Sequence, residues 1–156
     1  MFSKVFIANR GEIACRVIRA CRSLGVQSVL GFHEVDRASL GVRLADFSYL
    51  LTTSEGESPR AAYLDIHQIV EAARKTGCQA IHPGYGFLSE RAEFSKACQD
   101  AGLVFIGPEP ECIARLGDKT QAREVLKSAG LSLLPGSDGP CESLEQAVEI
   151  AEEMDY

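Results

Sequence analysis

Three amphipathic segments of the chain each end at a glycine and pass directly into a short apolar segment. The glycines are Gly25, Gly77 and Gly102. Before the first of them, apolar side chains such as Ile13 and Val17 recur at the spacing of a helix. A glycine just past the last periodic residue is a helix C-terminal signal. This alternation of helices and strands predicts an α/β fold with a parallel sheet and helices on both faces.

The same pattern gives bounds for each element. We expect strands at 4–8, 27–32, 47–51, 78–82 and 104–106, and helices at 11–24, 63–76 and 90–101. Beyond Pro110 the pattern predicts helices at 111–116, 119–129 and 143–153, an extended run at 131–134 and a loop at 135–140. Ligands bind beyond the carboxyl ends of such strands. The loops after Ala8, Phe32, His82 and Ile106 are therefore the places to look for a site.

Composition narrows the class of protein. Of the 156 residues, 46% are hydrophobic and 24% are charged, as in globular proteins, and the net charge of −6 argues against a nucleic-acid partner. No apolar run approaches the roughly 20 residues that cross a bilayer. The N-terminus has no signal-peptide cleavage pattern, so we expect a cytoplasmic protein with no membrane partner. The six cysteines form no CxxC pair, which favours reduced thiols over disulfides or a zinc site.

The first candidate loop is Asn9-Arg10-Gly11, between the first strand and the first helix. Free backbone N–H groups at a helix start favour anions. A plain turn, in which Asn9 caps the helix and Gly11 packs closely, fits the residues equally well. Only one glycine is present, so the GxGxxG fingerprint of a nicotinamide-binding Rossmann protein is missing.

The second candidate loop follows the strand that ends at His82. Glycines on either side of Tyr85 let the backbone approach a ligand, and the ring offers a flat wall. We expect Tyr85 to face a pocket and Phe87 to pack in the core. His82 is expected to be a hydrogen-bonded structural residue, and Ser89 or Glu90 to begin the next helix.

The third candidate is Lys119, which follows Asp118 at a predicted helix start. A cation there is unfavourable unless an anion lies nearby, which hints at phosphate, although a solvated lysine behind an aspartate cap is the favoured interpretation. No GxSxG, P-loop or HExxH motif is present, and we find no catalytic residues. His33, near Glu34 and Asp36, is expected to be a loop residue and not a metal ligand.

Taken together, several segments resemble the opening of biotin carboxylase, in the family's order and near its spacing. They are Ile7–Ala14 (IANRGEIA), Ala80–Glu90 (AIHPGYGFLSE), Phe105–Pro108 (FIGP), Gly117–Lys119 (GDK) and Pro135–Ser137 (PGS). The resemblance covers essentially the whole chain. The HPGYGFLSE run separates it from other ligases of the ATP-grasp superfamily.

The resemblance implies a Rossmann-like domain over 1–113 and the beginning of a truncated ATP-grasp region over 114–156. The family is a ligase that uses ATP and Mg²⁺ to activate bicarbonate and to carboxylate carrier-bound biotin. By resemblance, Lys119 contacts ATP and Arg19 lies at the dimer interface. The residues implied to line the biotin and bicarbonate pocket are Asn9, Arg10, Gly11, Gly84, Tyr85, Gly86 and Glu90.

The implied partners are a biotin carboxyl carrier, a carboxyltransferase and a second copy of the parent chain. The family serves acyl-CoA, pyruvate and urea carboxylation, including the step that feeds fatty acid biosynthesis. Position 23 is a serine, whereas the family often has an acidic residue there that pairs with the arginine at position 19. The loop Phe32–Arg37 matches the family only at Asp36-Arg37. The family's metal-binding glutamates and bicarbonate-binding residues lie beyond Tyr156, so we expect the isolated chain to be inactive. The alternative is a non-catalytic interaction or regulatory module that retains the fold.

Overall fold

The structure is a computed structural model that describes residues 2–117, 119–134, 136–137, 139 and 141–155, without the side chains of residues 119 and 120. The chain divides into two compact units, Met1–Ile113 and Ala114–Tyr156. The first unit holds the sheet and the candidate loops at its edge. The second holds the helices of the C-terminal segment.

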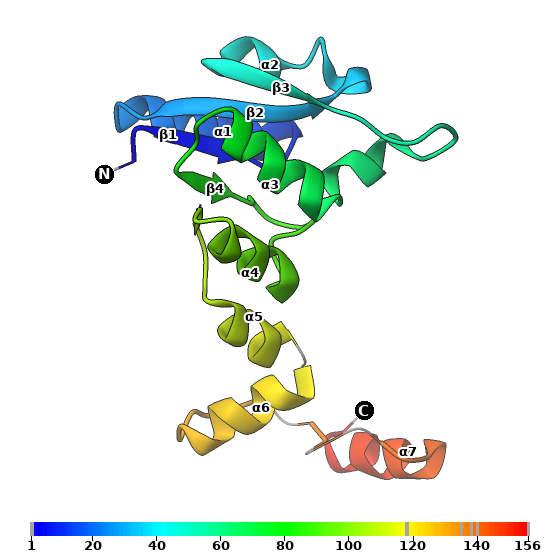
Figure 1. The fold of residues 1–156 in the computed structure, drawn as a ribbon. Coiled ribbons are helices and arrows are strands. Elements are labelled where there is room, and N and C mark those ends of the chain that lie inside the picture. The colour runs from blue at the N-terminus through cyan, green and yellow to red at the C-terminus, as the bar shows by residue number, and fades with distance from the viewer. Residues whose placement is uncertain (1, 118, 135, 138, 140, 156) are drawn as a thin grey trace. The chain divides into compact units, whose positions relative to one another are not determined.

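The first unit is built on a five-stranded parallel sheet in the order β3-β2-β1-β4-β5 (Figure 1). Its strands are β1 (Lys4–Ile7), β2 (Gln27–His33), β3 (Phe47–Leu51), β4 (Ala80–His82) and β5 (Val104–Phe105). Every pair of neighbouring strands is parallel. The predicted parallel α/β fold is confirmed.

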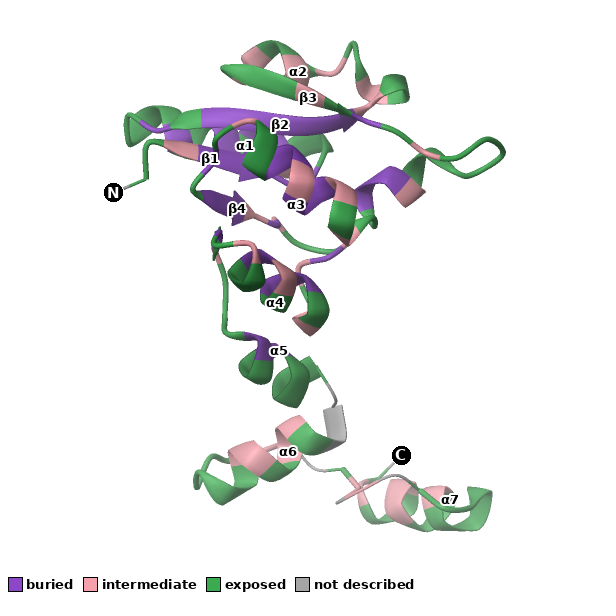
Figure 2. Ribbon diagram, viewed as in Figure 1, coloured by how far each residue is buried: buried purple, intermediate pink, exposed green. Residues whose placement is uncertain are grey.

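Strands β1, β2 and β4 are largely buried (Figure 2), because helices cover both faces of the sheet and alternate strand residues pack into two separate core clusters. Val5 and Ile7 face α1 (Gly11–Ser23) and α2 (Leu40–Leu44), whereas Phe6 faces α3 (Ile66–Lys75) and α4 (Ala92–Asp100). Strands buried on both faces read as continuous apolar runs. This explains why the first strand shows no polar alternation in the sequence.

The glycine signals mark the helix ends as predicted. α1, α3 and α4 each end two residues before a glycine with positive φ, namely Gly25, Gly77 and Gly102. At the end of α1, the N–H of Val26 donates to the carbonyl of Cys21 and the N–H of Gly25 to that of Arg22, and the other two helices repeat this pair of bonds. These are Schellman caps, in which a left-handed residue satisfies the last carbonyls of the helix.

The helix starts differ from the prediction. The second predicted helix begins at Ile66, capped by Asp65, and not at residue 63, because Pro59–Tyr63 forms a separate 3₁₀ helix, η2. The third begins at Ala92 and not at Glu90, because residues 87–90 form a turn in which the N–H of Ser89 donates to the carbonyl of Gly86. The short helix α2 and the 3₁₀ helix η1 (Glu34–Asp36) were not predicted.

The second unit contains the remainder of α5 (Pro110–Gly117), which begins in the first unit, with α6 (Lys119–Ser128) and α7 (Leu144–Glu153). Residues 131–134 are not a strand, so the extended run predicted there is not a sheet element. Large apolar side chains of this unit are exposed: Leu116, Leu131, Leu134, Leu144 and Val148. The predicted cap Asp118 and the loop residues Pro135, Asp138 and Pro140 lie outside the described residues.

The cysteines are free thiols, as predicted. Cys112 and Cys141 are exposed, whereas Cys98 is fully buried and burial raises its pKa to about 12. We therefore expect a thiol reagent at pH 8 to label Cys112 and Cys141 quickly and the four buried cysteines only after denaturation. Mass spectrometry of labelled peptides measures this, and rapid native labelling at Cys98 would contradict the burial described here.

Among the described residues, no helix has both the length and the apolar character needed to cross a membrane.

Candidate functional site

The loops after β1 and β4 meet at one edge of the sheet because these two strands are neighbours. Ile7 at the end of β1 is paired with His82 at the end of β4. The N–H of Ala8 then donates to the carbonyl of His82, at 3.0 Å, which extends the pairing into the loops. Asn9 therefore lies beside the loop after β4, residues 83–87, which we call the glycine-rich loop because Gly84 and Gly86 flank Tyr85. Both loops lie at the edge where ligands bind in parallel sheets.

Asn9 binds the two loops together. Its side chain is 3% exposed, and Nδ2 donates to the carbonyls of Pro83 (2.8 Å) and Tyr85 (2.9 Å). Its Oδ1 accepts from the N–H of Arg10 at 2.9 Å, so both ends of the amide are used. A buried amide that spans two loops fixes their separation, since a lost partner leaves a buried polar group unpaired.

This geometry corrects the plain-turn interpretation of the first loop. The N-cap residue of α1 is Arg10, whose side chain makes no capping bond, so Asn9 does not cap the helix. Nor does Gly11 pack closely, because a Cβ added there would meet nothing within 4 Å. Gly11 has a φ of +64°, a conformation that favours glycine.

Gly84 is required for the close approach of the second loop. It has a φ of +69°, and an added Cβ would lie 2.5 Å from Nδ2 of Asn9 and 2.7 Å from Cγ2 of Ile13. No side chain fits at such distances. Gly86 also has positive φ, at +65°, but an added Cβ there would meet nothing within 4 Å. Gly84 therefore permits both the close approach to Asn9 and the positive φ, whereas Gly86 permits only the positive φ.

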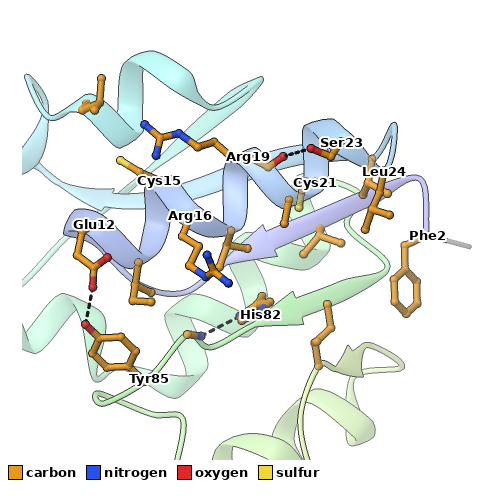
Figure 3. Close-up of a pocket in the computed structure, with 18 residues that line it drawn as sticks. Phe2, Glu12, Cys15, Arg16, Arg19, Cys21, Ser23, Leu24, His82 and Tyr85 are labelled. Atoms are coloured by element: carbon orange, nitrogen blue, oxygen red, sulfur yellow. Dashed lines mark hydrogen bonds between the residues drawn. The ribbon is translucent and has the colours of Figure 1, made fainter.

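Tyr85 projects from between these glycines and is 62% exposed, as predicted. Its hydroxyl donates to Oε1 of Glu12, in the first turn of α1, at 2.6 Å (Figure 3). Both residues line a largely apolar groove of about 1100 Å³ that runs along α1 and also includes Arg16 and Arg19. The Tyr85 ring thus offers an accessible flat wall in a groove that is lined by α1 and also by Val5 and His82.

The aromatic and histidine residues around Tyr85 have structural roles. Phe87 is half-buried and packs against the core, as predicted. Nδ1 of His82 accepts a hydrogen bond from the N–H of Gly84 at 2.9 Å, which confirms a structural histidine. Burial lowers the pKa of His82, so the ring is neutral at pH 7 and accepts this bond.

We predict that Glu12→Gln lowers the pKa of Tyr85. The hydrogen bond to Glu12 and the negative charge of that carboxylate raise the Tyr85 pKa above its usual value of 10. Removing the charge removes most of this effect. A pH titration of the chain with ¹³C-labelled tyrosine measures the change, with the buried Tyr63 as internal control. An unchanged Tyr85 pKa would show that the bond does not form in solution.

Of the other predicted site residues, Arg19 lines this groove, whereas Arg10 and Glu90 do not. Arg10 turns toward Asp36 and pairs with its carboxylate through Nε, at 2.8 Å, and through Nη2. Glu90 is exposed and ends the turn that precedes α4. Arg19 is exposed on α1, and the hydroxyl of Ser23 donates to its carbonyl (Figure 3). The side chain of Lys119 lies outside the described residues.

Sequence reasoning missed Tyr63 and the role of Asn9. Both act through partners far away in the chain, and only the neighbouring positions of the strands bring those partners together. Across the described part of the chain, no group of three or more His, Cys, Asp or Glu residues is placed to hold a metal ion. His33 is the last residue of β2 and not the loop residue that we expected, and its Nδ1 accepts a hydrogen bond from the N–H of Val35 at the start of η1.

Comparison with known proteins identifies the family to which the chain belongs. Residues 1–113 match the family described as "Biotin carboxylase, N-terminal domain". The chain belongs to the biotin carboxylase family. It is 46% identical to the 2-oxoglutarate carboxylase small subunit of Hydrogenobacter thermophilus and 44% identical to biotin carboxylase 1 of Bacillus subtilis, in each case over 156 residues.

Solved biotin carboxylase structures share the fold. The biotin carboxylase domain dimer of the H. thermophilus enzyme, in complex with MgADP, ADP and bicarbonate, matches with a TM-score of 0.89 and 46% identity. That match covers 100% of this chain and 34% of the other. The two sequence relatives are likewise covered to 32% and 34% of their lengths. The chain thus spans about a third of the biotin carboxylases that it matches.

Proposed function

We propose that this chain forms one wall of a biotin carboxylase active site, in a ligase that uses ATP and bicarbonate to carboxylate carrier-bound biotin. The observation that carries the proposal is the Asn9-bound loop Gly84–Gly86, which holds an exposed tyrosine at the carboxyl edge of the sheet. Backbone without Cβ atoms permits close approach of a bicyclic ligand, and the Tyr85 ring supplies an apolar face. In this role Tyr85 orients biotin and excludes water beside it.

The support for ATP and bicarbonate in this proposal comes from the relatives. The H. thermophilus domain binds MgADP and bicarbonate. We assign contact with ATP to Lys119, at the start of α6. The described residues offer no cluster that fits Mg²⁺, so we assign its ligands to none of them. ATP supplies the phosphoryl group that activates bicarbonate, and the residues described here bind and orient biotin.

We further propose that residues 1–156 alone have no carboxylase activity. Phosphoryl transfer needs metal ions and cationic groups around the transferring phosphate, and one lysine does not provide them. The exposed leucines of the second unit, such as Leu134 and Leu144, would pack against the remainder of the ATP-grasp region. Bicarbonate-dependent ATP hydrolysis by purified 1–156 would overturn this part of the proposal.

The partners follow from the same assignment. The homologous domain forms a dimer, and we propose that the α1 surface around Arg19 faces a second copy in the parent enzyme. A biotin carboxyl carrier presents the substrate, and a carboxyltransferase chooses the acceptor. The relatives include 2-oxoglutarate and pyruvate carboxylases, which share this opening although their acceptors differ.

A chimera tests the proposed function. Residues 1–156 replace the matching third of biotin carboxylase 1 of B. subtilis, to which the chain is 44% identical. We expect ATP hydrolysis that depends on both bicarbonate and biotin. A chimera that folds and dimerises without this activity would favour the alternative, a module that keeps the fold for protein contacts only.

A further inference from the structure

Tyr63 is a buried polar side chain at the carboxyl edge of the sheet. It lies at the end of η2, and 2% of its surface is exposed. Its hydroxyl donates to Oδ2 of Asp36 at 2.7 Å and accepts from the N–H of His33 at 2.9 Å. The hydroxyl thus both donates and accepts inside the protein, and its two partners lie at the end of β2 and in η1, which follows β2.

The ring of Tyr63 contacts the glycine-rich loop. Its centre lies 5.5 Å from that of Phe87, in a tilted arrangement. Phe87 has a φ of +47°, in the left-handed region that non-glycine residues seldom occupy. Surrounding contacts must hold such a residue in place, and the buried Tyr63 ring is one of them.

Asp36 links Tyr63 to the loop after β1. Its carboxylate binds the guanidinium of Arg10, the residue next to Asn9. Burial of Asp36 works to raise its pKa, but the hydrogen bonds from Arg10 and Tyr63 outweigh burial and lower it. The carboxylate is therefore charged at pH 7, and its bonds to both partners are charge-assisted.

We propose that Tyr63 is a positioning residue for the glycine-rich loop, joining the loops after β1, β2 and β4 through its hydroxyl and its ring. Its hydroxyl holds Asp36 and, through it, Arg10, while its ring supports Phe87 and the turn that carries Tyr85. An effect of Tyr63 on biotin binding rests on the proposed function, whereas the positioning of the glycine-rich loop by Tyr63 does not.

The test is hydrogen exchange of ¹⁵N-labelled chain in which Tyr63→Phe removes one oxygen and keeps the ring. The reporters are the amides of Ser89 and Arg91, which donate to the carbonyls of Gly86 and Leu88. We expect their exchange to speed up about tenfold relative to amides in the middle of α1, as for loss of a buried hydrogen bond to a charged group. The amide signal of Tyr85 should shift as well.

Two further variants complete the design. Tyr49→Phe removes the hydroxyl of a half-buried tyrosine on edge strand β3 and should leave the loop unchanged. Asp36→Asn keeps an oxygen acceptor for Tyr63 but removes the charge that binds Arg10, so the same amides should respond by a smaller factor, even if Tyr63→Phe fails to fold.

Equal loop exchange in Tyr63→Phe and the unmodified chain would overturn the positioning role. So would equal acceleration in α1, α3 and the loop, which indicates loss of global stability alone. No biotin is present in this experiment. A loop response combined with an inactive chimera would therefore reject the proposed function and leave the positioning role standing.

Discussion

Replacing Asn9 by aspartate is expected to destabilise the first unit by about 3 kcal/mol at pH 7, although the two side chains have the same shape. The carboxylate oxygen that replaces Nδ2 would face the carbonyl oxygens of Pro83 and Tyr85, at 2.8 and 2.9 Å in the present structure. Three oxygens without a proton repel one another, and the new charge is buried without a cation. Urea unfolding measures the difference.

The pH dependence of this variant has a definite sign. In the folded state the two carbonyls favour the protonated form of the new carboxyl, so its pKa is raised above the unfolded value of roughly 3.9. A group with a raised folded pKa contributes stability below the unfolded pKa and loses it as pH rises through the folded pKa. The deficit of Asn9→Asp relative to the unmodified chain should therefore shrink as pH falls from 7 toward 4.

The control for this comparison is Gln27→Glu, the same amide-to-acid change at an exposed position on β2. It should alter the free energy of unfolding by less than about 0.5 kcal/mol. If Asn9→Asp were as stable as this control at pH 7, the Asn9 side chain would not be bonded to the glycine-rich loop.

Gly84→Ala has the second large expected effect, a loss of about 3 kcal/mol in the free energy of unfolding. The added methyl would lie 2.5 Å from Nδ2 of Asn9 and 2.7 Å from Cγ2 of Ile13. Overpacking of this kind costs about 1–3 kcal/mol, and the left-handed backbone adds about 1–2 kcal/mol. Asn9 would have to move, which breaks its bonds to the loop.

Gly86→Ala is the matched control, because its φ of +65° is close to that of Gly84 but the added methyl meets open space. Only the backbone cost of about 1–2 kcal/mol applies there. Urea denaturation of both variants separates the two terms. Equal destabilisation by the two substitutions would contradict the close approach of Gly84 to Asn9.

The sequence predicted the scaffold because local signals determine it. Glycines at helix C-termini act within a few residues of the helix that they end, so Gly25 and Gly77 were sufficient to place the ends of α1 and α3. Once helices alternate with apolar strands, the parallel sheet and its binding edge follow. The exposure of Tyr85 followed from the glycines on either side of it.

The details of the site were not predictable in this way. Asn9 looked like a helix cap, but both partners of its Nδ2 lie more than 70 residues away in the sequence. Tyr63 was predicted only as the start of the second helix, although it lies in η2. Its hydroxyl partners, on His33 and Asp36, become neighbours only when η2 packs beside the end of β2. Contacts of this kind depend on tertiary structure, and periodicity does not encode them.

The most direct test of the account is the KM for biotin of the B. subtilis chimera with and without Tyr85→Ala. If the Tyr85 ring forms the wall that faces biotin, its removal should raise the KM for biotin about tenfold and leave the KM for ATP unchanged, as expected for loss of one aromatic contact. An unchanged KM for biotin, or an equal rise in the KM for ATP, would contradict the account.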